Sequence, residues 1–152
     1  MIDFYEQQQK ILDFTKNGFS AFLEQKGLES PAIFTSDALD LDKYKAAFCA
    51  FADFASYNIE PLSSDSRNAK LTFDLYFVKR NADAPTLKKQ LLAITSAFYA
   101  WFYGEDESEN CNRCFSGLTD WSDITEINFY DAVSGSQNIK IAQITIQSSM
   151  EI

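Results

Sequence analysis

Apolar residues at helical spacing mark two segments of the chain. Residues 3–26 carry them at a period of about 3.6 residues, against a face of glutamine, glutamate and lysine. Residues 85–103 repeat the spacing with a wider apolar face. Gly27 and Gly104 follow these segments, where glycine commonly ends a helix, while Gly18 interrupts the first one at a cost of about 1 kcal/mol relative to alanine. The pattern predicts helices over 3–26 and 85–103, the second packed across a sheet face.

Alternation of apolar and polar residues marks the strands. It is clearest over residues 69–78, whose apolar members are Leu71, Phe73, Leu75 and Phe77. Pro31–Thr35 is predicted as a short strand, and Ile124–Val133 and Ile139–Gln147 as a hairpin around the turn Ser134–Gln137. In the last strand the apolar residues change face partway, which indicates a bulge or burial on both sides. The inner-face candidates of the strand before it are Ile127, Phe129 and Ala132.

Residues 44–58 fit two periods. A helical face would carry Leu41, Tyr44, Phe48, Phe51 and Ala55, and the alanine content favours a helix. A strand face would carry Phe48, Ala50, Ala52 and Phe54. The strand 69–78 needs a partner, and the segment just before the turn-rich residues 63–68 is the nearest one that can close onto it. A hairpin is therefore favoured here.

Together these elements predict an α+β fold in a single domain, residues 1–152. Its sheet is mainly antiparallel, built from two hairpins and packed with a long N-terminal helix and a central apolar helix. Residues 104–117 are predicted to form an acidic loop. A chain of this length buries roughly 70% of the surface that its unfolded form exposes, so it needs no disulfides to fold.

Composition narrows the chemistry. Lys and Arg number 13 against 22 Asp and Glu, a net charge of −9, and there is no histidine. The acid excess disfavours general nucleic-acid binding, which needs clustered cations. The lack of histidine excludes Ser-His-Asp and Cys-His mechanisms and histidine-ligated metals. Because no phosphate-loop, dinucleotide-binding or nucleophile-elbow motif occurs either, we predict a non-enzymatic protein without catalytic residues, cofactor or metal.

Three cysteines provide the only candidate sulfur chemistry. Cys111 and Cys114 form a CxxC motif in the acidic loop, and Cys49 stands alone. Three cysteines without histidine leave a tetrahedral zinc site incomplete, and the acidic surroundings argue against a redox-active thiolate. Plain loop cysteines are predicted, and pairing of Cys111 with Cys114 stays open.

Two groups of acidic residues could in principle bind a cation or act as paired carboxylates. The first lies in the loop, lacks the EF-hand spacing and is predicted to be solvated: Glu105, Asp106, Glu107 and Glu109. The second recurs every three residues, in a context typical of a turn and the entry to a strand: Asp120, Asp123 and Glu126.

Aromatic residues make up 15% of the chain. Most are predicted to fill the core. Tyr99, Trp121 and Tyr130 are candidates for an interface, where aromatic side chains are enriched, and self-association is expected.

No targeting or membrane segment is expected. The first residues lack the basic and apolar regions of a secretory signal. The longest apolar stretch, Leu91–Tyr103, has about thirteen residues, fewer than the roughly 20 that span a bilayer. An odd number of cysteines does not suit a disulfide framework. We expect a cytoplasmic protein with reduced thiols and no membrane partner.

The order of these elements resembles the tail-completion, or tail-terminator, proteins of tailed bacteriophages and prophages. The strand 68–78, the helix Leu87–Phe102 and the hairpin Ile124–Ile146 carry the resemblance. It implies a small α+β subunit that assembles into a ring, often a hexamer, between the tail tube and the neck or connector proteins. Such a subunit stops tube growth, first in the cytoplasm and then in the tail of the virion. The family has no signature motif, so no functional residue transfers to this chain.

The acidic charge suits a ring of this kind. A channel through which DNA passes benefits from an acidic wall that does not hold phosphate. The alternative is an acidic interaction module of a non-viral bacterial protein, of adaptor or immunity type, that meets a basic partner.

Overall fold

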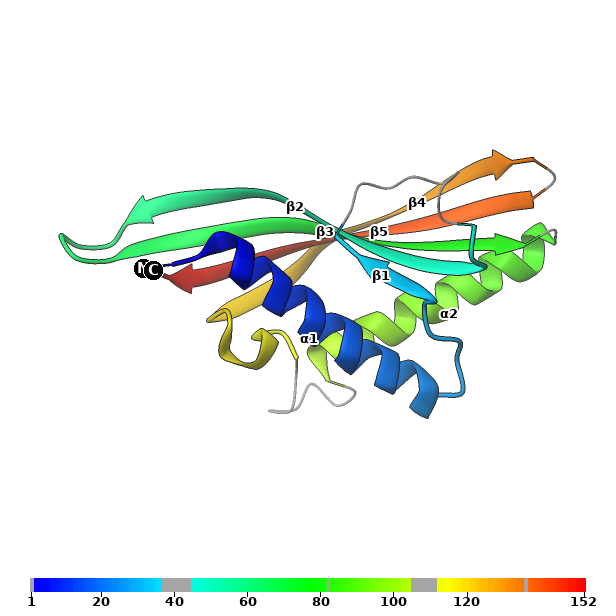
Figure 1. Ribbon diagram of the computed structural model, residues 1–152, viewed down its shortest axis with the longest axis horizontal. Helices are drawn as coiled ribbons and strands as arrows, with labels where there is room; N and C mark the ends of the chain where they lie inside the picture. Colours follow the sequence, from blue (N-terminus) through cyan, green and yellow to red (C-terminus); the bar gives the residue numbers. More distant parts are fainter. Residues whose placement is uncertain (1, 37–44, 82, 105–111, 136) are drawn as a thin grey trace.

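The computed structural model describes residues 2–36, 45–81, 83–104, 112–135 and 137–152. Over these residues the chain is an α+β structure with two α-helices and a five-stranded sheet (Figure 1). Both predicted helices are confirmed, and the main strands are longer than predicted. The elements are α1 (Phe4–Gln25), β1 (Ile33–Thr35), β2 (Phe48–Pro61), β3 (Arg67–Asn81), α2 (Ala84–Tyr103), the 3-10 turn η1 (Phe115–Gly117), β4 (Trp121–Ser134) and β5 (Gln137–Glu151).

The strands lie in the order β1-β2-β3-β5-β4. β2 pairs antiparallel with β3, and β5 pairs antiparallel with both β3 and β4, so both predicted hairpins are present. β1 instead runs parallel to β2, with Ile33 opposite Cys49. The sheet is therefore mixed, whereas the sequence predicted two antiparallel hairpins and assigned no direction to the short strand. A strand of three residues has too few side chains for its pattern to reveal the direction of its partner.

The ambiguous segment 44–58 forms a strand from Phe48 onward, and residues 41–44 lie outside the described part of the chain. Phe54 stands opposite Phe73 across the β2–β3 ladder, with ring centroids 5.0 Å apart. Pairing with β3 thus outweighs the helix propensity of the alanines, because tertiary contacts override local preference.

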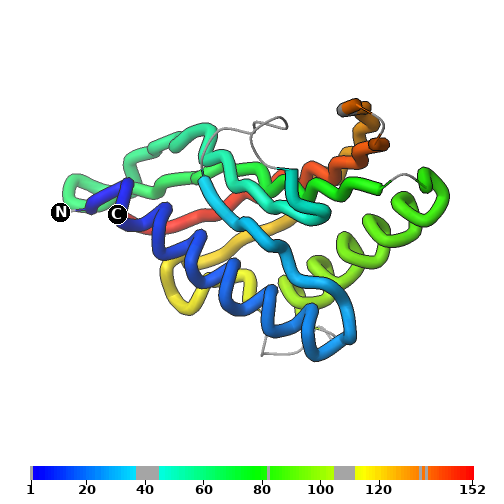
Figure 2. Tube along the Cα trace, turned by 45° about the vertical axis from the view of Figure 1, so that its right-hand side comes forward, coloured from blue at the N-terminus to red at the C-terminus, as the bar shows by residue number. Residues whose placement is uncertain are grey.

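Both helices pack on one face of the sheet (Figures 1 and 2). Phe19 of α1, Phe77 of β3 and Phe98 of α2 form a triangle of fully buried rings, with centroids 5.2, 5.4 and 5.6 Å apart. An aromatic pair at such a distance contributes about 0.5–1.5 kcal/mol beyond its burial. This aromatic triangle holds both helices on β3.

β5 buries apolar side chains on both of its faces. Ala142, Ile144 and Ile146 face the helices. Ile139 and Ile141 belong to a second buried cluster on the opposite, open face, whose other members are Cys49, Phe51 and Val78. Because the register of β5 against β3 runs without interruption, the change of face comes from burial on both sides and not from a bulge in β5.

Bulges occur instead in β2 and β4. One lies between Phe54 and Ser56, and the other between Ile124 and Glu126. Ala132, predicted to face inward with Ile127 and Phe129, packs against the second cluster on the open face. Successive side chains of a strand point to opposite faces. Because Ala132 is an odd number of residues from Ile127 and from Phe129, it cannot share their face.

The described end of the predicted loop 104–117 contains a core residue. Phe115 begins η1 and is fully buried against Phe14, Phe73 and Phe102. Its φ of 47° lies in the left-handed region, which is uncommon for a bulky residue. Burial of the ring therefore stabilises this uncommon backbone conformation. The polar residues around Phe115 did not predict that it is part of the core.

Gly18 lies where α1 meets Trp101 of α2. A Cβ atom at this position would stand 2.9 Å from Cζ2 of Trp101, well inside the separation of about 3.5–4.0 Å that carbon atoms prefer. The indole is 5% exposed and packs against the rings of Phe14, Phe19 and Phe98. The close approach of the two helices thus explains a glycine in the middle of a helix.

We expect Gly18→Val to lower the free energy of unfolding by about 2 kcal/mol, because the branched side chain would overpack the contact with Trp101. Asn17→Val is the matched control. Asn17 is exposed on the same turn, so this change should cost less than about 1 kcal/mol. Urea unfolding followed by circular dichroism measures both, and equal losses would contradict this packing of α1 on α2.

Candidate interaction surface

Large apolar side chains stay exposed in three places on the described surface. Two groups lie on the helix side of the sheet and the third lies on the open face. Exposed apolar side chains on a soluble protein are candidates for contact with another molecule. Each of these three groups is therefore a candidate of this kind.

The amino-end patch comprises Phe4, Tyr5, Ile59 and Leu62, which are 37–73% exposed. Asp3 caps α1 by accepting a hydrogen bond from the amide of Glu6 at 3.0 Å. The ring of Phe4 lies 4.5 Å from that of Tyr57, whose hydroxyl donates to Gln7 Oε1 at 2.9 Å. α1 therefore begins against the end of β2, and the β2–β3 turn extends past it (Figure 1).

The α2–β4 patch comprises Leu92, Tyr99, Phe129 and Val133. Leu92 and Tyr99 lie seven positions apart in α2, so they share one stripe of the helix. Phe129 and Val133 point to the helix side of β4, yet they are 50% and 74% exposed. The second half of β4 thus presents its inner face without a covering helix.

Tyr103 ties this stripe of α2 to β4. Its ring lies 4.7 Å from that of Tyr99, one turn earlier. Its hydroxyl accepts a hydrogen bond from the amide of Ile124 at 2.9 Å and donates to Asp123 Oδ1 at 3.2 Å. Burial raises the pKa of Tyr103 above its ordinary value, and the protonated phenol is the donor in the bond to Asp123. The stripe that carries Tyr99 therefore faces β4 rather than α1.

The third group, Trp121 and Tyr130, lies along β4 on the open face and is about half exposed, at 53% and 48%. The hydroxyl of Tyr130 donates to Gln143 Oε1 at 2.7 Å, and Gln143 Nε2 donates to the hydroxyl of Tyr76 at 3.2 Å. The three interface candidates from the sequence, Tyr99, Trp121 and Tyr130, are thus exposed but divide between the two faces.

A row of carboxylates crosses the middle of the open face. Asp53 stands directly opposite Asp74 in the β2–β3 ladder, and Thr145 of β5 donates to Asp74 Oδ1 at 2.6 Å. Glu126 of β4 stands opposite Thr145. Burial raises the pKa of Tyr76, and the charges of Asp74 and Asp53 raise it further. The open face therefore has a band of negative potential.

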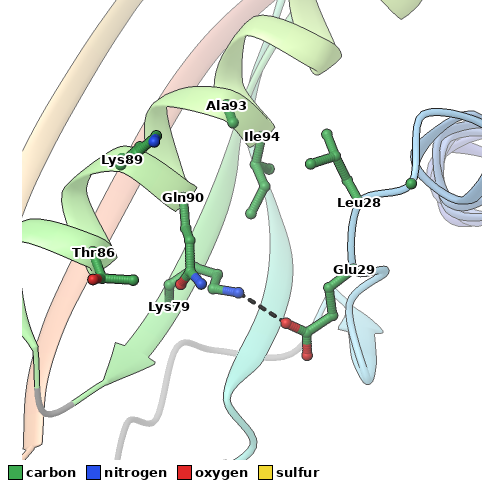
Figure 3. Close-up of a pocket in the computed structure, with 9 residues that line it drawn as sticks. Leu28, Glu29, Lys79, Thr86, Lys89, Gln90, Ala93 and Ile94 are labelled. Atoms are coloured by element: carbon green, nitrogen blue, oxygen red, sulfur yellow. Dashed lines mark hydrogen bonds and ion pairs between the residues drawn. The ribbon is translucent and has the colours of Figure 1, made fainter.

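A cavity of about 510 Å³ lies between the end of α1, the end of β3 and the first half of α2 (Figure 3). Lys79 is 4% exposed, and its ammonium group lies 2.9 Å from Glu29 Oε2 and 5.2 Å from the ring centre of Phe48. Lys89 contributes to the lining from α2. Because Glu29 neutralises the buried ammonium group, Lys79 has the environment of a structural ion pair. No local pattern predicts this pair, since Lys79 and Glu29 are 50 positions apart.

The cysteines are not brought together where the structure describes them. Cys111 and the acidic residues 105–109 lie outside the described part of the chain. The thiol of Cys114 is free and donates to the carbonyl of Asp120 at 3.4 Å. Cys49 is buried in the second cluster; burial raises the pKa of its thiol, and Arg80 offsets part of that rise. Among the described residues, no group of three cysteine, aspartate or glutamate side chains is placed to hold a metal ion.

The three acids at the start of β4 have separate surroundings. Asp120 Oδ2 accepts a hydrogen bond from the amide of Glu151 at 3.0 Å. Asp123 forms an ion pair with Arg113 at 2.6 Å, and the guanidinium group also lies 4.9 Å from the ring centre of Trp121. Glu126 is exposed beyond the bulge. The arrangement joins the described end of the 104–117 segment to β4 and does not form a carboxylate pair.

Comparison with known proteins finds no matching family model and no curated sequence that counts as a relative. Neither α-helix in the described part of the chain is long and apolar enough to cross a membrane.

We expect iodoacetamide to alkylate Cys114 in the folded protein and to leave Cys49 unmodified, because Cys49 is buried and its raised pKa keeps it in the unreactive thiol form. Peptide mass spectrometry after timed exposure measures both. Labelling in concentrated guanidinium chloride is the control, in which both cysteines should react. Modification of the two at equal rates in the folded protein would refute this placement of Cys49.

Asp123→Ala should lower the free energy of unfolding by about 1–2 kcal/mol, because Arg113 and Tyr103 would lose a partly buried acceptor. Glu126→Ala removes the same charge from an exposed position three residues later, and should cost less than about 0.5 kcal/mol. Denaturant titration compares the two variants. A loss for Glu126→Ala as large as that for Asp123→Ala would show that the Arg113 contact adds no stability.

Proposed function

We propose that this chain is a non-enzymatic structural subunit of a tailed phage or prophage, which completes the tail or joins it to the head as part of a homo-oligomeric ring. The order of the elements supports the proposal. A long N-terminal helix, a short strand, a hairpin with one strongly alternating strand, an apolar helix and a C-terminal hairpin follow one another as the resemblance implies.

The observation that carries the proposal is the presence of two different apolar patches on one molecule. The amino-end patch and the α2–β4 patch consist of different residues on different elements. A contact between two unlike patches is heterologous: each copy uses one patch to bind the previous copy and the other to bind the next. Such contacts close into a ring when the rotation between copies divides a full turn.

The carboxylate row supports the second half of the proposal. Asp53, Asp74 and Glu126 give the open face a band of negative charge. If this face lines the channel of the ring, it repels the phosphates of DNA and lets the duplex pass without binding. Tail-tube and neck proteins would then contact the rims of the ring, and the protein would pass from the cytoplasm into the virion tail.

The first test is the oligomeric state. Gel filtration with light scattering, at tens of micromolar protein, should give a mass several times that of the monomer. Negative-stain electron microscopy of the same fraction should show closed rings. A strict monomer would contradict the ring and would favour the alternative, an acidic module that binds a basic partner.

The second test is genomic. Reading frames beside the gene should encode capsid, portal or tape-measure proteins. This observation does not depend on purification, and neighbours without any virion gene would contradict the phage assignment even if rings form.

A further inference from the structure

The amino-end patch and the far end of the α2–β4 patch, at Val133, lie at opposite ends of the sheet. The amino-end patch belongs to the start of α1 and the end of β2, next to the β2–β3 turn. Val133 is next to the last residue of β4, near the β4–β5 turn, and Figure 1 places these two turns at opposite ends of the long axis. The β2–β3 turn and the far end of β4 therefore cannot meet within one molecule, but they can meet between two copies.

The charges around the two patches are complementary. α2 contains two lysines, Lys88 and Lys89, and no acidic residue, and the one acid between Phe129 and Val133, Asp131, is paired with Lys140. Lys88 lies one turn before Leu92 and shares its stripe. At the other end, Asp3 and Asp65 are exposed and form no ion pair with any other described residue, whereas Glu60 alternates with Ile59 and points to the open face. Opposite charges bordering apolar patches orient one surface on another.

The same side of the amino-end patch holds one further cation. The guanidinium group of Arg67 donates to the backbone carbonyls of Ser63 and Ser66, at 3.2 and 3.1 Å, and is held in the β2–β3 turn. Glu6 pairs with Lys10 at 3.0 Å. The acids that remain therefore outnumber the cations at this end.

The open edges of the sheet favour a contact through side chains. β1 pairs with only three residues of β2, from Cys49 to Phe51, so in the described part of the chain the rest of β2 forms an edge, as does β4. Each of these edges contains a bulge, at Phe54/Ser56 and at Ile124/Glu126. Bulges disrupt the ladder and protect edges from pairing with other strands. Two copies are thus expected to meet through their apolar patches rather than by extending the sheet.

We infer that the occupant of each patch is a second copy of this chain: the amino-end patch of one copy binds the α2–β4 patch of the next, with Lys88 facing the acids of its neighbour. The inference rests on the proposed ring, and it deepens that proposal by naming the seam. Tyr5 and Ile59 of one copy then cover Leu92, Tyr99 and Phe129 of the next.

The test uses two double variants of the full chain. Tyr5→Glu with Ile59→Glu blocks the amino-end patch, and Leu92→Glu with Phe129→Glu blocks the α2–β4 patch. All four side chains are at least 43% exposed, so the fold should be retained, and circular dichroism and thermal unfolding check this directly. Trp121→Glu is the matched control, because Trp121 is 53% exposed and lies outside both patches.

Each double variant should be monomeric on its own, whereas Trp121→Glu should assemble like the unmodified chain. An equimolar mixture of the two double variants should form a dimer and nothing larger, since each copy keeps one working patch. Assembly of either double variant alone would overturn the head-to-tail seam. A mixture that stays monomeric would overturn it as well.

A single charge change tests the orientation of the seam. Lys88→Glu should raise the dissociation constant of the assembly by about tenfold, measured by light scattering over a dilution series. Lys16→Glu makes the same change on the exposed face of α1 and should leave the constant unaltered. Equal effects of the two changes would contradict the pairing of Lys88 with a neighbour. If the unmodified chain never assembles, the ring itself is overturned. If the chain assembles but the patch variants assemble equally well, only the seam is overturned.

Discussion

The sheet of this protein is longer than the helices that cover it. β3 and β5 contain 15 residues each, which at about 3.3 Å per residue span about 50 Å. α1 and α2 contain 22 and 20 residues, which at about 1.5 Å per residue span about 33 and 30 Å. The aromatic triangle of Phe19, Phe77 and Phe98 holds both helices on β3. Neither helix can then cover the sheet from end to end.

Length explains the first exposed patch, and the width of the sheet explains the second. The end of β2 extends past the start of α1, whereas the second half of β4 is uncovered because α2 packs mainly on β3 and β5, inward of the edge strand β4. Apolar side chains remain at both places, in the amino-end patch and the α2–β4 patch. Burying apolar surface contributes about 25 cal/mol for each Å², so a contact that covers both patches at once favours assembly, less the entropy that the two copies lose on binding. The open face combines a polar network and a carboxylate row with two exposed aromatic side chains, Trp121 and Tyr130; in the proposed ring it would face the channel.

The sequence predicted the elements of this fold better than their surroundings. Alternation identified β3, and helical spacing identified α1 and α2, because each depends on residues close in the chain. The parallel direction of β1, the burial of Phe115 and the ion pair of Lys79 with Glu29 depend on residues far apart, and no local period contains them. The two-sided burial of β5 was visible as a change of face, but only the continuous register with β3 decided against a bulge.

The interaction surface was predicted in part. Tyr99, Trp121 and Tyr130 are exposed, as expected of interface candidates, yet Leu92, Phe129 and Val133 were not separated from core residues. The spacing of apolar residues along a helix or a strand is the same whether or not another element covers them. Only the three-dimensional arrangement shows that α2 leaves one stripe uncovered.

Hydroxyl-radical footprinting across a concentration series tests the central claim most directly, because it reports the burial of individual aromatic side chains. Phe4, Tyr5, Tyr99 and Phe129 should become protected together as the protein assembles, while Trp121 and Tyr130 keep the reactivity that they have in dilute solution. Protection of Trp121 and Tyr130, with the two helix-side patches still reactive, would contradict the account.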